Sequence, residues 1–434
     1  MARFLFTVWP FPTHLDPFIA LANALRGRGH EAAFYSGGEG GAVLSREGYR
    51  CYPFEEVDWR RVAETVDDLI AGRRRPSQMR RLWPKFLVET ARGQVRDIER
   101  ILAQWPADAL ICDIAMWGPI LVLHERLGIP VIPFSHVANC ILPGPERPVP
   151  GVALPGGGRG LARMLGRALA AGAELVTART RREANALRRE FNLPPLHVSV
   201  NAYTGSMPLY LVPGAPEFDN HRGDLPRPVH YVGPCLWDKH QGQAAPPWLA
   251  TVPTGRPCVV VDEGALFTPE PRLLELAARG LADLPLTVIL LAGHGRDPAG
   301  LKLGRLPDNV TLHANAPLSD VLPKAKVLVT NGNTESVLNG LQAGLPVVVV
   351  PSLWDQAEMA WRVQETGVGL RLAPRRPRPK DLQGAVLRVL NERSFGLNVA
   401  AMQAAFARYG GPQHAAELIE QAIATAVPNG IFST

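Results

Sequence analysis

The stretch VLVTNGNTESVLNGLQAGLPVVVVPSLWDQ, residues 327–356, reads as a buried strand, a tight turn, a helix and a second buried strand. Both apolar runs are continuous rather than alternating, which is typical of strands that are covered on both faces. Parallel strands need a crossover between them, and a helix is the usual one. The stretch therefore predicts an α/β protein built on doubly wound parallel sheets.

The same alternation of strand and helix extends along the rest of the chain. Further strands are expected at 3–8, 31–36, 108–113, 129–134, 256–264, 286–293 and 309–314. A helix is expected at 117–128, and another begins near Asp16, which can cap it, with Pro17 in its first turn. Pro and Gly are frequent between 143 and 160, which predicts a long loop there.

The strands fall into two similar halves, so two domains are expected. We predict an N-terminal domain at 1–220, a linker at 221–245, a C-terminal domain at 246–395, and C-terminal helices at 396–434 that pack back toward the first domain. A chain of 434 residues is too long for one ordinary core, which agrees with this division.

Composition narrows the class of protein. Hydrophobic residues at 46% and charged residues at 20% are typical of a soluble globular protein. The five Cys include no C-x-x-C pair, so neither a zinc site nor a disulfide framework is indicated, and a cytoplasmic location is expected. The apolar start is broken by Pro10 and Pro12, and we interpret it as the first buried strand rather than as a membrane segment.

A basic segment, RRRPSQMRRLWPKF at 73–86, combines six cations with two aromatic residues. Such charge runs usually form a solvated helix face. The alternative is a weak peripheral contact with an anionic membrane surface, at the inner face of the membrane. No nucleic-acid-binding motif accompanies the segment, so a nucleic-acid partner is not expected.

Three further motifs give a family resemblance. They are THLDP at 13–17, VHYVGP at 229–234, and AGLPVVVVPSLWDQAEMAWRVQETGVGLRL at 343–372. With them the chain resembles the family 1 glycosyltransferases of the GT-B fold, the group of the UDP-glycosyltransferases and of bacterial enzymes that decorate antibiotics, macrolides and carotenoids. The resemblance implies two Rossmann-like domains facing across a cleft, with a nucleotide-sugar donor mainly on the second and a small-molecule acceptor mainly on the first.

The resemblance also implies the catalytic residues. His14 takes the place of the family's general base, and imidazole suits that role because its pKa lies near neutrality. Asp113, at the end of an expected strand, takes the place of the acid that orients the base; its other interpretation is a helix cap. Direct displacement with inversion at the anomeric carbon is implied, without a metal or another cofactor.

On the donor side, Asp355 and Gln356 match the pair that holds sugar hydroxyls in the family, with Trp354 as a wall beside them. Asp355 can also be a helix cap. The turn at 331–339 departs from the family's His-Gly-Gly, any residue, Gly-Thr, and Glu three residues later. The family's phosphate-binding His has become Asn331, a Gly has become Glu335, and the ribose-binding Glu has become Asn339.

Other donor contacts are expected from residues that still offer amides, a hydroxyl or a positive charge. We list Gly332, Asn333, Ser336, His294 and Arg296, together with Gly264 in the altered loop DEGAL, while the family's base-stacking aromatic residue is replaced near Asn315. Three explanations remain: a nucleotide-sugar held differently, a different donor or reaction, or a non-catalytic relative that binds a ligand or a partner. Retention of the two catalytic residues and of the acid–amide pair favours transfer.

The acceptor is expected to be small and apolar or aromatic, of the natural-product type. Aromatic residues of the first half that suit an apolar cleft are Trp59, Trp83, Phe86, Trp117 and Phe134. Each of them is equally suited to the core. The sugar, the exact acceptor and the oligomeric state are left open by the sequence.

Overall fold

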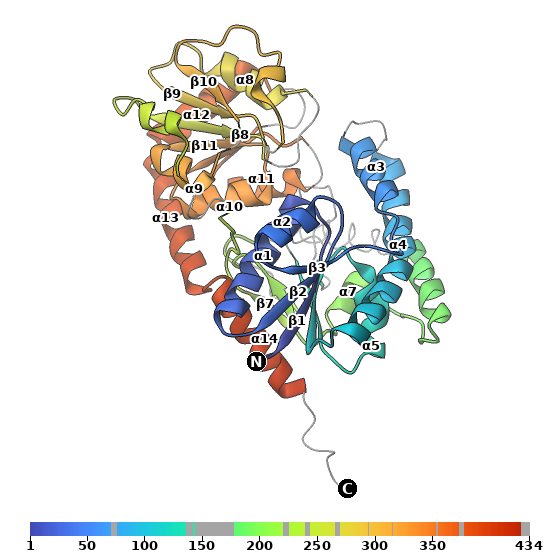
Figure 1. The fold of residues 1–434 in the computed structure, drawn as a ribbon. Coiled ribbons are helices and arrows are strands. Elements are labelled where there is room, and N and C mark those ends of the chain that lie inside the picture. The colour runs from blue at the N-terminus through green and yellow to red at the C-terminus, as the bar shows by residue number, and fades with distance from the viewer. Residues whose placement is uncertain are drawn as a thin grey trace, which may run out of the picture.

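The structure is a computed structural model. It describes residues 1–70, 76–135, 142–143, 178–219, 225–238, 244–264, 270–293, 295–314, 316–352, 355–372 and 377–426. Two parallel sheets form the centres of two domains, one above the other in Figure 1. This confirms the predicted fold class.

The first domain holds a seven-stranded sheet in the order β3-β2-β1-β4-β5-β6-β7. Its strands are β1 (Arg3–Thr7), β2 (Glu31–Tyr35), β3 (Arg50–Tyr52), β4 (Ala109–Asp113), β5 (Val131–Phe134), β6 (Tyr210–Val212) and β7 (Val229–Tyr231). Its helices are α1 (Pro12–Gly27), α2 (Gly40–Arg46), α3 (Trp59–Ile70), α4 (Pro76–Gln104), the π-helical turn η1 (Pro119–Leu123), α5 (His124–Arg126) and α7 (Val200–Thr204), and 178–190 is also helical.

The second domain holds a six-stranded sheet in the order β10-β9-β8-β11-β12-β13. Its strands are β8 (Cys258–Asp262), β9 (Thr287–Leu291), β10 (Val310–His313), β11 (Val327–Thr330), β12 (Val347–Val349) and β13 (Gly369–Arg371). Its helices are α8 (Arg272–Gly280), α9 (Leu318–Val321), α10 (Thr334–Gln342), α11 (Gln356–Glu365), α12 (Pro379–Asn391), α13 (Arg393–Arg408) and α14 (Pro412–Ala426), with 3₁₀ turns η3 (Pro247–Thr251), η4 (Pro298–Gly300) and η5 (Leu322–Lys324).

Strand order reverses at one place in each sheet. In the first sheet the chain moves outward from β1 through β2 to β3, and later from β4 to the other edge. In the second sheet the same reversal lies between β8 and β11. In open α/β sheets, ligands bind in the crevice beyond the carboxyl ends of the strands at such a switch point. Functional side chains are therefore expected in the loops after β1, β4, β8 and β11.

Two local predictions need correction, and one is confirmed with a slightly earlier end. Helix α1 begins at Pro12, before the predicted cap Asp16, because Pro12 already supplies the fixed φ that suits a first helical turn; Pro17 then lies inside the helix. The helix expected at 117–128 is present over 117–126, with a π-helical turn at Pro119–Leu123 within it. The span 221–245, predicted as a linker, contributes β7, which pairs with β6 as the edge strand of the first sheet.

The end of the chain returns to the first domain. Figure 1 shows α13 and α14 running from the second domain down the side of the first. Ala415, Ala416 and Ile419 of α14 are fully buried in the core that α1 forms with the first sheet. Arg28, just after α1, donates two hydrogen bonds of 2.9 and 2.7 Å to the Glu420 carboxylate of α14.

A buried ionic cluster joins the two domains. Arg362 of α11 lies 2.8 Å from Asp219, which follows β6, and 2.7 Å from Glu358 of its own helix. The hydroxyl of Tyr231 in β7 donates to Asp219 at 2.6 Å. Helix α11 of the second domain is thereby fixed to the edge of the first sheet.

We expect Arg362→Leu to lower the free energy of unfolding by about 3–5 kcal/mol, because it leaves buried carboxylates without their cation. Denaturant titration measures the loss. The control is Arg388→Leu on α12, where the arginine is 57% exposed and paired with Glu392, and where less than about 1 kcal/mol is expected. Equal losses in the two variants would contradict a special role for the domain-joining cluster.

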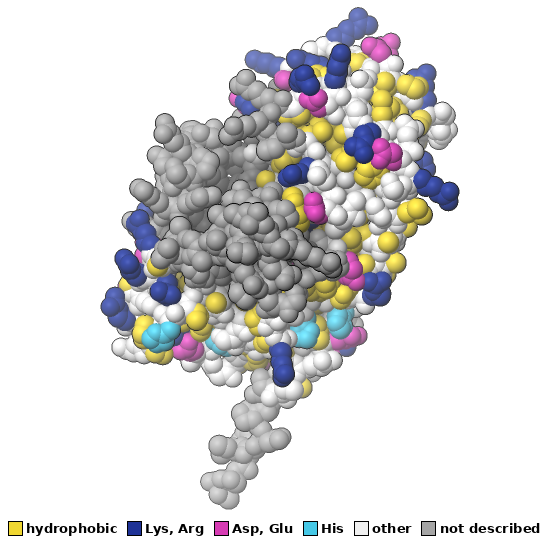
Figure 2. All heavy atoms as spheres, turned by 180° about the vertical axis from the view of Figure 1, so that it is seen from behind, with side chains coloured by type: hydrophobic (Ala, Val, Ile, Leu, Met, Phe, Trp, Pro, Cys, Tyr) yellow, Lys and Arg dark blue, Asp and Glu magenta, His cyan; other side chains and the backbone are white. Residues whose placement is uncertain are grey.

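On the face shown in Figure 2, the visible Lys and Arg side chains are scattered and form no single patch. The predicted basic segment at 73–86 lies largely outside the described residues, since 71–75 and the side chains of 76–85 are not among them. Among the described helices none combines the length and the apolar character needed to cross a membrane.

Candidate active site

His14 and Asp113 meet at the switch point of the first sheet. His14 lies in the first turn of α1, because this helix begins earlier than predicted, and Asp113 is the last residue of β4. The imidazole Nδ1 lies 2.6 Å from Oδ2 of Asp113. The Asp113 side chain is fully buried, and the His14 side chain is 17% exposed.

The backbone around Asp113 fixes how its carboxylate faces His14. The N–H of Ala115 donates to Oδ1 at 2.8 Å, and the N–H of Trp9 approaches Oδ2 at 3.5 Å. A carboxylate accepts hydrogen bonds, so the proton of a neutral His14 is on Nδ1 and its Nε2 carries the lone pair of the ring. The pair is therefore arranged as a base and the acid that orients it.

An aromatic wall, formed by Phe11, Phe54 and Trp59, stands next to this pair. The rings of Phe11 and His14 are 5.5 Å apart, and the rings of Phe11 and Trp59 are also 5.5 Å apart. Phe54 lies 6.0 Å from Trp59. All three side chains are only partly buried, so they leave apolar surface near the base.

The other predicted acceptor residues differ in position. Phe86 and Trp117 are nearly buried in the same core as the aromatic wall, and Phe86 packs 6.1 Å from Trp9. Phe134 is fully enclosed and packs 4.9 Å from Phe18 of α1, in the other core, so it serves the fold rather than an acceptor surface. The side chain of Trp83 lies outside the described residues.

Two residues of the aromatic wall, Phe11 and Phe54, were not among the acceptor residues predicted from the sequence. Phe11 stands three residues before His14, and that proximity was the available signal. Phe54 comes from the loop after β3, and no local pattern connects it with the base.

The altered turn lies at the switch point of the second sheet and is bonded within itself. The N–H of Asn333 donates to Oδ1 of Asn331 at 3.1 Å, and the N–H of Glu335 donates to Oδ1 of Asn333 at 2.9 Å. Gly332 has φ of +92°, and a Cβ there would lie 2.7 Å from Val349. Two amides that could serve an anion thus already have partners inside the turn.

Asn331 and Ser336 join this turn to the end of β8. The Asn331 amide group donates to the carbonyl of Glu263 at 2.7 Å, and the Ser336 hydroxyl donates to Asp262 at 2.5 Å. Asn339 donates to the carbonyl of Glu335 in its own helix at 2.9 Å. Gly264 lies against Asn333 at the same edge. The predicted side chains therefore come together, and each of these polar groups makes a contact within the protein.

Arg296 forms a buried ion pair with Glu263, a residue that the sequence did not single out. The Arg296 side chain is 10% exposed and the Glu263 side chain 4%. Glu263 also accepts from the N–H of Leu273 at the start of α8, at 3.3 Å. Burial raises the pKa of Glu263 to about 7, although Arg296 and the Leu273 N–H lower it; nearby Asp262 adds to the rise. This carboxyl therefore titrates near neutral pH.

The acid–amide pair begins α11. Asp355 is the residue before the helix, and its side chain makes no capping hydrogen bond, so the interpretation as a side-chain cap is not supported. Gln356 is 3% exposed, and its Oε1 accepts from the N–H and the hydroxyl of Ser352, both at 2.9 Å. Predicted donor residues His294 and Trp354, and also Asn315, lie outside the described residues.

The described residues include no group of three or more His, Cys, Asp or Glu side chains that could hold a metal ion.

Comparison with known proteins places this geometry in context. Residues 281–422 match the family described as erythromycin biosynthesis protein CIII-like, C-terminal domain. The chain is 30% identical to 4'-demethylrebeccamycin synthase of Lentzea aerocolonigenes over 96% of this chain and 99% of that protein. It is 24% identical to demethyllactenocin mycarosyltransferase of Streptomyces fradiae over 97% of this chain and 86% of the relative. The structure of the calicheamicin glycosyltransferase CalG4 superposes with a TM-score of 0.75 at 23% identity, covering 99% of this chain and 100% of that one.

Proposed function

Because the chain belongs to the family 1 glycosyltransferases of the GT-B fold that serve antibiotic and natural-product biosynthesis, we propose that it moves a sugar from a nucleoside diphosphate to a hydroxyl of a small aromatic acceptor. The transfer inverts the anomeric carbon, with His14 as the base and Asp113 as the residue that orients it. The observation that carries the proposal is the 2.6 Å contact of this pair at the switch point of the first sheet.

On the acceptor side, the hydroxyl must lose its proton as its oxygen attacks the anomeric carbon. Nε2 of His14 takes that proton, and Asp113 stabilises the imidazolium that results. The bond from the anomeric carbon to the diphosphate oxygen breaks in the same displacement, and the nucleoside diphosphate leaves with the electron pair. The aromatic wall holds a flat ring against the base, since aromatic surfaces stack favourably.

On the donor side, the nucleotide is held at the second switch point. The spinosyn rhamnosyltransferase SpnG, a structural neighbour with a TM-score of 0.69, is complexed with thymidine diphosphate. In this chain Asp355 and Gln356 would contact the sugar hydroxyls. Arg296 would contact the diphosphate after leaving Glu263, which then takes up a proton because a buried carboxylate without its cation is costly.

This donor arrangement predicts that Glu263→Gln tightens binding of thymidine diphosphate. The carboxylate competes with the diphosphate for Arg296, and a charge-assisted hydrogen bond contributes about 1.5–3 kcal/mol, or roughly tenfold or more in affinity. Glu263 has a pKa raised to about 7, so in the wild type it is protonated below that pH and competes above it. Calorimetry should therefore find the advantage of the variant small at pH 6 and large at pH 8.

The control is Glu125→Gln, which removes a carboxylate from the partly buried pair with Arg188 in the first domain. Ionisation of the diphosphate itself changes over the same pH range and affects all three proteins alike. Only the difference in affinity between the wild type and the variant therefore reports the ionisation of Glu263. Weaker binding by Glu263→Gln at every pH would show that the pair is structural.

The proposed function is tested by incubating the protein with thymidine-diphospho-glucose and a panel of flat phenols, and by analysing the products by mass spectrometry. A product heavier by one hexosyl unit, with β configuration from an α donor, is expected. The alternative is a non-catalytic or repurposed relative, which the internally bonded turn favours. Absence of both turnover and nucleoside diphosphate binding at millimolar concentration would support that alternative.

A further inference from the structure

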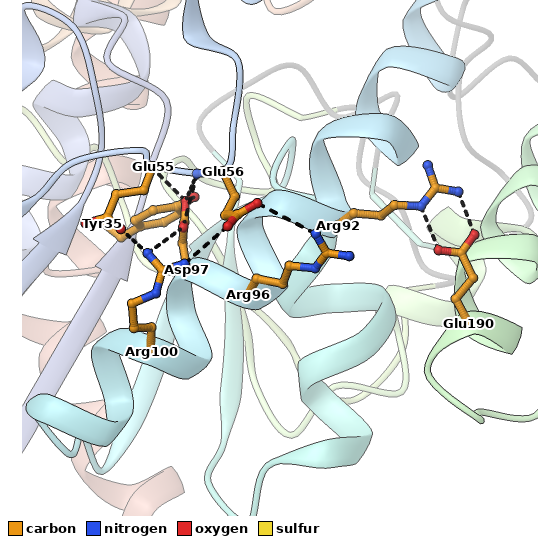
Figure 3. Close-up of polar contacts among 8 residues, drawn as sticks. All are labelled: Tyr35, Glu55, Glu56, Arg92, Arg96, Asp97, Arg100 and Glu190. Carbon is orange, nitrogen blue, oxygen red and sulfur yellow. Dashed lines mark hydrogen bonds and ion pairs between the residues drawn. The ribbon is translucent and has the colours of Figure 1, made fainter.

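Asp97 is a buried carboxylate in the last third of α4 that none of the proposed chemistry uses. Its side chain is 2% exposed. It accepts from the Tyr35 hydroxyl at 2.8 Å and from the N–H groups of Glu55 and Glu56, at 3.0 and 3.1 Å respectively (Figure 3). Two donors come from the loop after β3 and the third from the end of β2, so one carboxylate joins three separate parts of the first domain.

The loop held in this way is residues 53–58, which we call the strap because it leads from β3 to Trp59. It lies directly on α4, because a Cβ on Gly93 would be 2.6 Å from the carbonyl oxygen of Glu56. Arg100 and Arg96 also pair with the strap's glutamates, but these arginines are 41% and 63% exposed. Exposed pairs contribute little to stability, so Asp97 is the main polar anchor of the strap.

The anchor is connected to the catalytic pair through a row of rings. The ring of Tyr35 lies 4.8 Å from that of Phe54, which comes from the strap itself. From Phe54 the contacts continue through Trp59 and Phe11 to His14. A shift of the strap would therefore move the aromatic wall relative to the base.

The hydrogen bond from Tyr35 to Asp97 persists around neutral pH. Burial, with the neighbouring Asp97 charge, raises the pKa of Tyr35 well above its usual value, so its hydroxyl stays a donor. Removing the carboxylate would leave the Tyr35 hydroxyl and two backbone N–H groups without their acceptor, and buried donors need one. The strap would then relax toward solvent.

We propose that Asp97 is a positioning residue for the acceptor: it fixes, through the strap and Tyr35, the gap between the aromatic wall and His14, and so makes the site selective for flat aromatic hydroxyl compounds. The inference rests on the proposed function, because it assumes that the acceptor lies between the wall and the base. Asp97 touches neither reactant, so its effect is on fit rather than on the chemical step.

The test compares Asp97→Asn and Tyr35→Phe with the wild type, using alizarin, a flat diol, as acceptor and thymidine-diphospho-glucose as donor. Asp97→Asn is expected to raise the KM for alizarin by roughly tenfold, because the amide removes the negative charge that holds all three donors at Oδ2 and pairs with Arg100, and turns an NH2 group toward the N–H of Glu56. The KM for the donor should be unchanged. Tyr35→Phe keeps the ring and two of the three hydrogen bonds, so a rise of a few-fold is expected.

The matched control is Glu190→Gln. It breaks the pair that Glu190 makes with Arg92, also on α4 and shown in Figure 3, without touching the strap. Its KM for alizarin should equal that of the wild type. Hydrogen exchange of the amides of Glu55 and Glu56 should be faster in Asp97→Asn and unchanged in the control.

The outcomes separate this inference from the proposed function. An unchanged KM for alizarin despite faster exchange of the strap would make Asp97 merely structural and would overturn the inference while transfer itself stands. Equal increases in the KM for donor and for acceptor would overturn the inference as well. If Asp97→Asn does not fold, Tyr35→Phe decides by the same comparison. If no transfer is found, binding of alizarin measured by calorimetry replaces KM, and a wild type that binds no flat phenol ends the inference together with the proposed acceptor.

Discussion

Replacing His14 with Ala is expected to lower kcat by about 100- to 10,000-fold, because the acceptor hydroxyl then loses its proposed base. The imidazole is the only group of the proposed pair that is partly exposed, and Asp113 behind it is fully buried and cannot reach the acceptor in its place. Steady-state kinetics with saturating donor and acceptor measure the loss.

Donor binding and folding serve as controls for this variant. The proposed site of the nucleotide is on the other domain, so the affinity for thymidine diphosphate should match that of the wild type. Turnover within tenfold of the wild type would remove His14 from the mechanism. Partial recovery with added imidazole would support its role as a base.

Asp113→Asn is expected to impair transfer by roughly 100-fold or more, and more severely than Asp113→Ala. The N–H of Ala115 points at Oδ1 at 2.8 Å and needs an acceptor, so the Asn oxygen should occupy that place. The Asn amino group then faces Nδ1 of His14 and donates to it. This stabilises the tautomer with its proton on Nε2, which cannot act as a base.

Asp113→Ala removes the orienting group without imposing the wrong tautomer, and a water molecule can replace the carboxylate. Kinetics of the two variants at one pH, with circular dichroism to check the fold, test this order. An alanine variant that is slower than the asparagine variant would show that the charge of Asp113, rather than its control of the tautomer, is what the reaction needs.

The fold could be predicted from the sequence because its strands are continuous apolar runs. Residues 258–262 and 327–330 became buried central strands as expected, since runs of Val and Leu fit a sheet that is covered on both faces. Local details depended on competing signals. Asp16 followed by Pro17 looked like a helix start, but Pro12 offered an earlier one, and backbone hydrogen bonds to Phe11 formed from His14 and Leu15.

Some residues of the candidate site could be predicted from the sequence and others could not, for physical reasons. His14 follows β1 and Asp113 ends β4, and these strands are neighbours in the sheet, so topology brings the two residues together across 99 positions of sequence. Glu263 could not be identified, because its significance comes from burial beside Arg296, and burial of a charged side chain contradicts the usual pattern. The role of Asp97 depends on backbone amides of a distant loop, which no residue pattern encodes.

The position of α14 has a consequence for how the protein is made. The seven strands of the first sheet are complete once β7 has been synthesised, but α14, which begins at Pro412, is needed to cover α1. At synthesis rates of about 5–20 residues per second, the interval between these two events is on the order of 10 to 40 s. During that time the apolar side chains of α1 that α14 covers in the finished protein are exposed on the nascent chain. The domain that is translated first is therefore the last to finish folding, and α1 is the surface that a chaperone would have to protect.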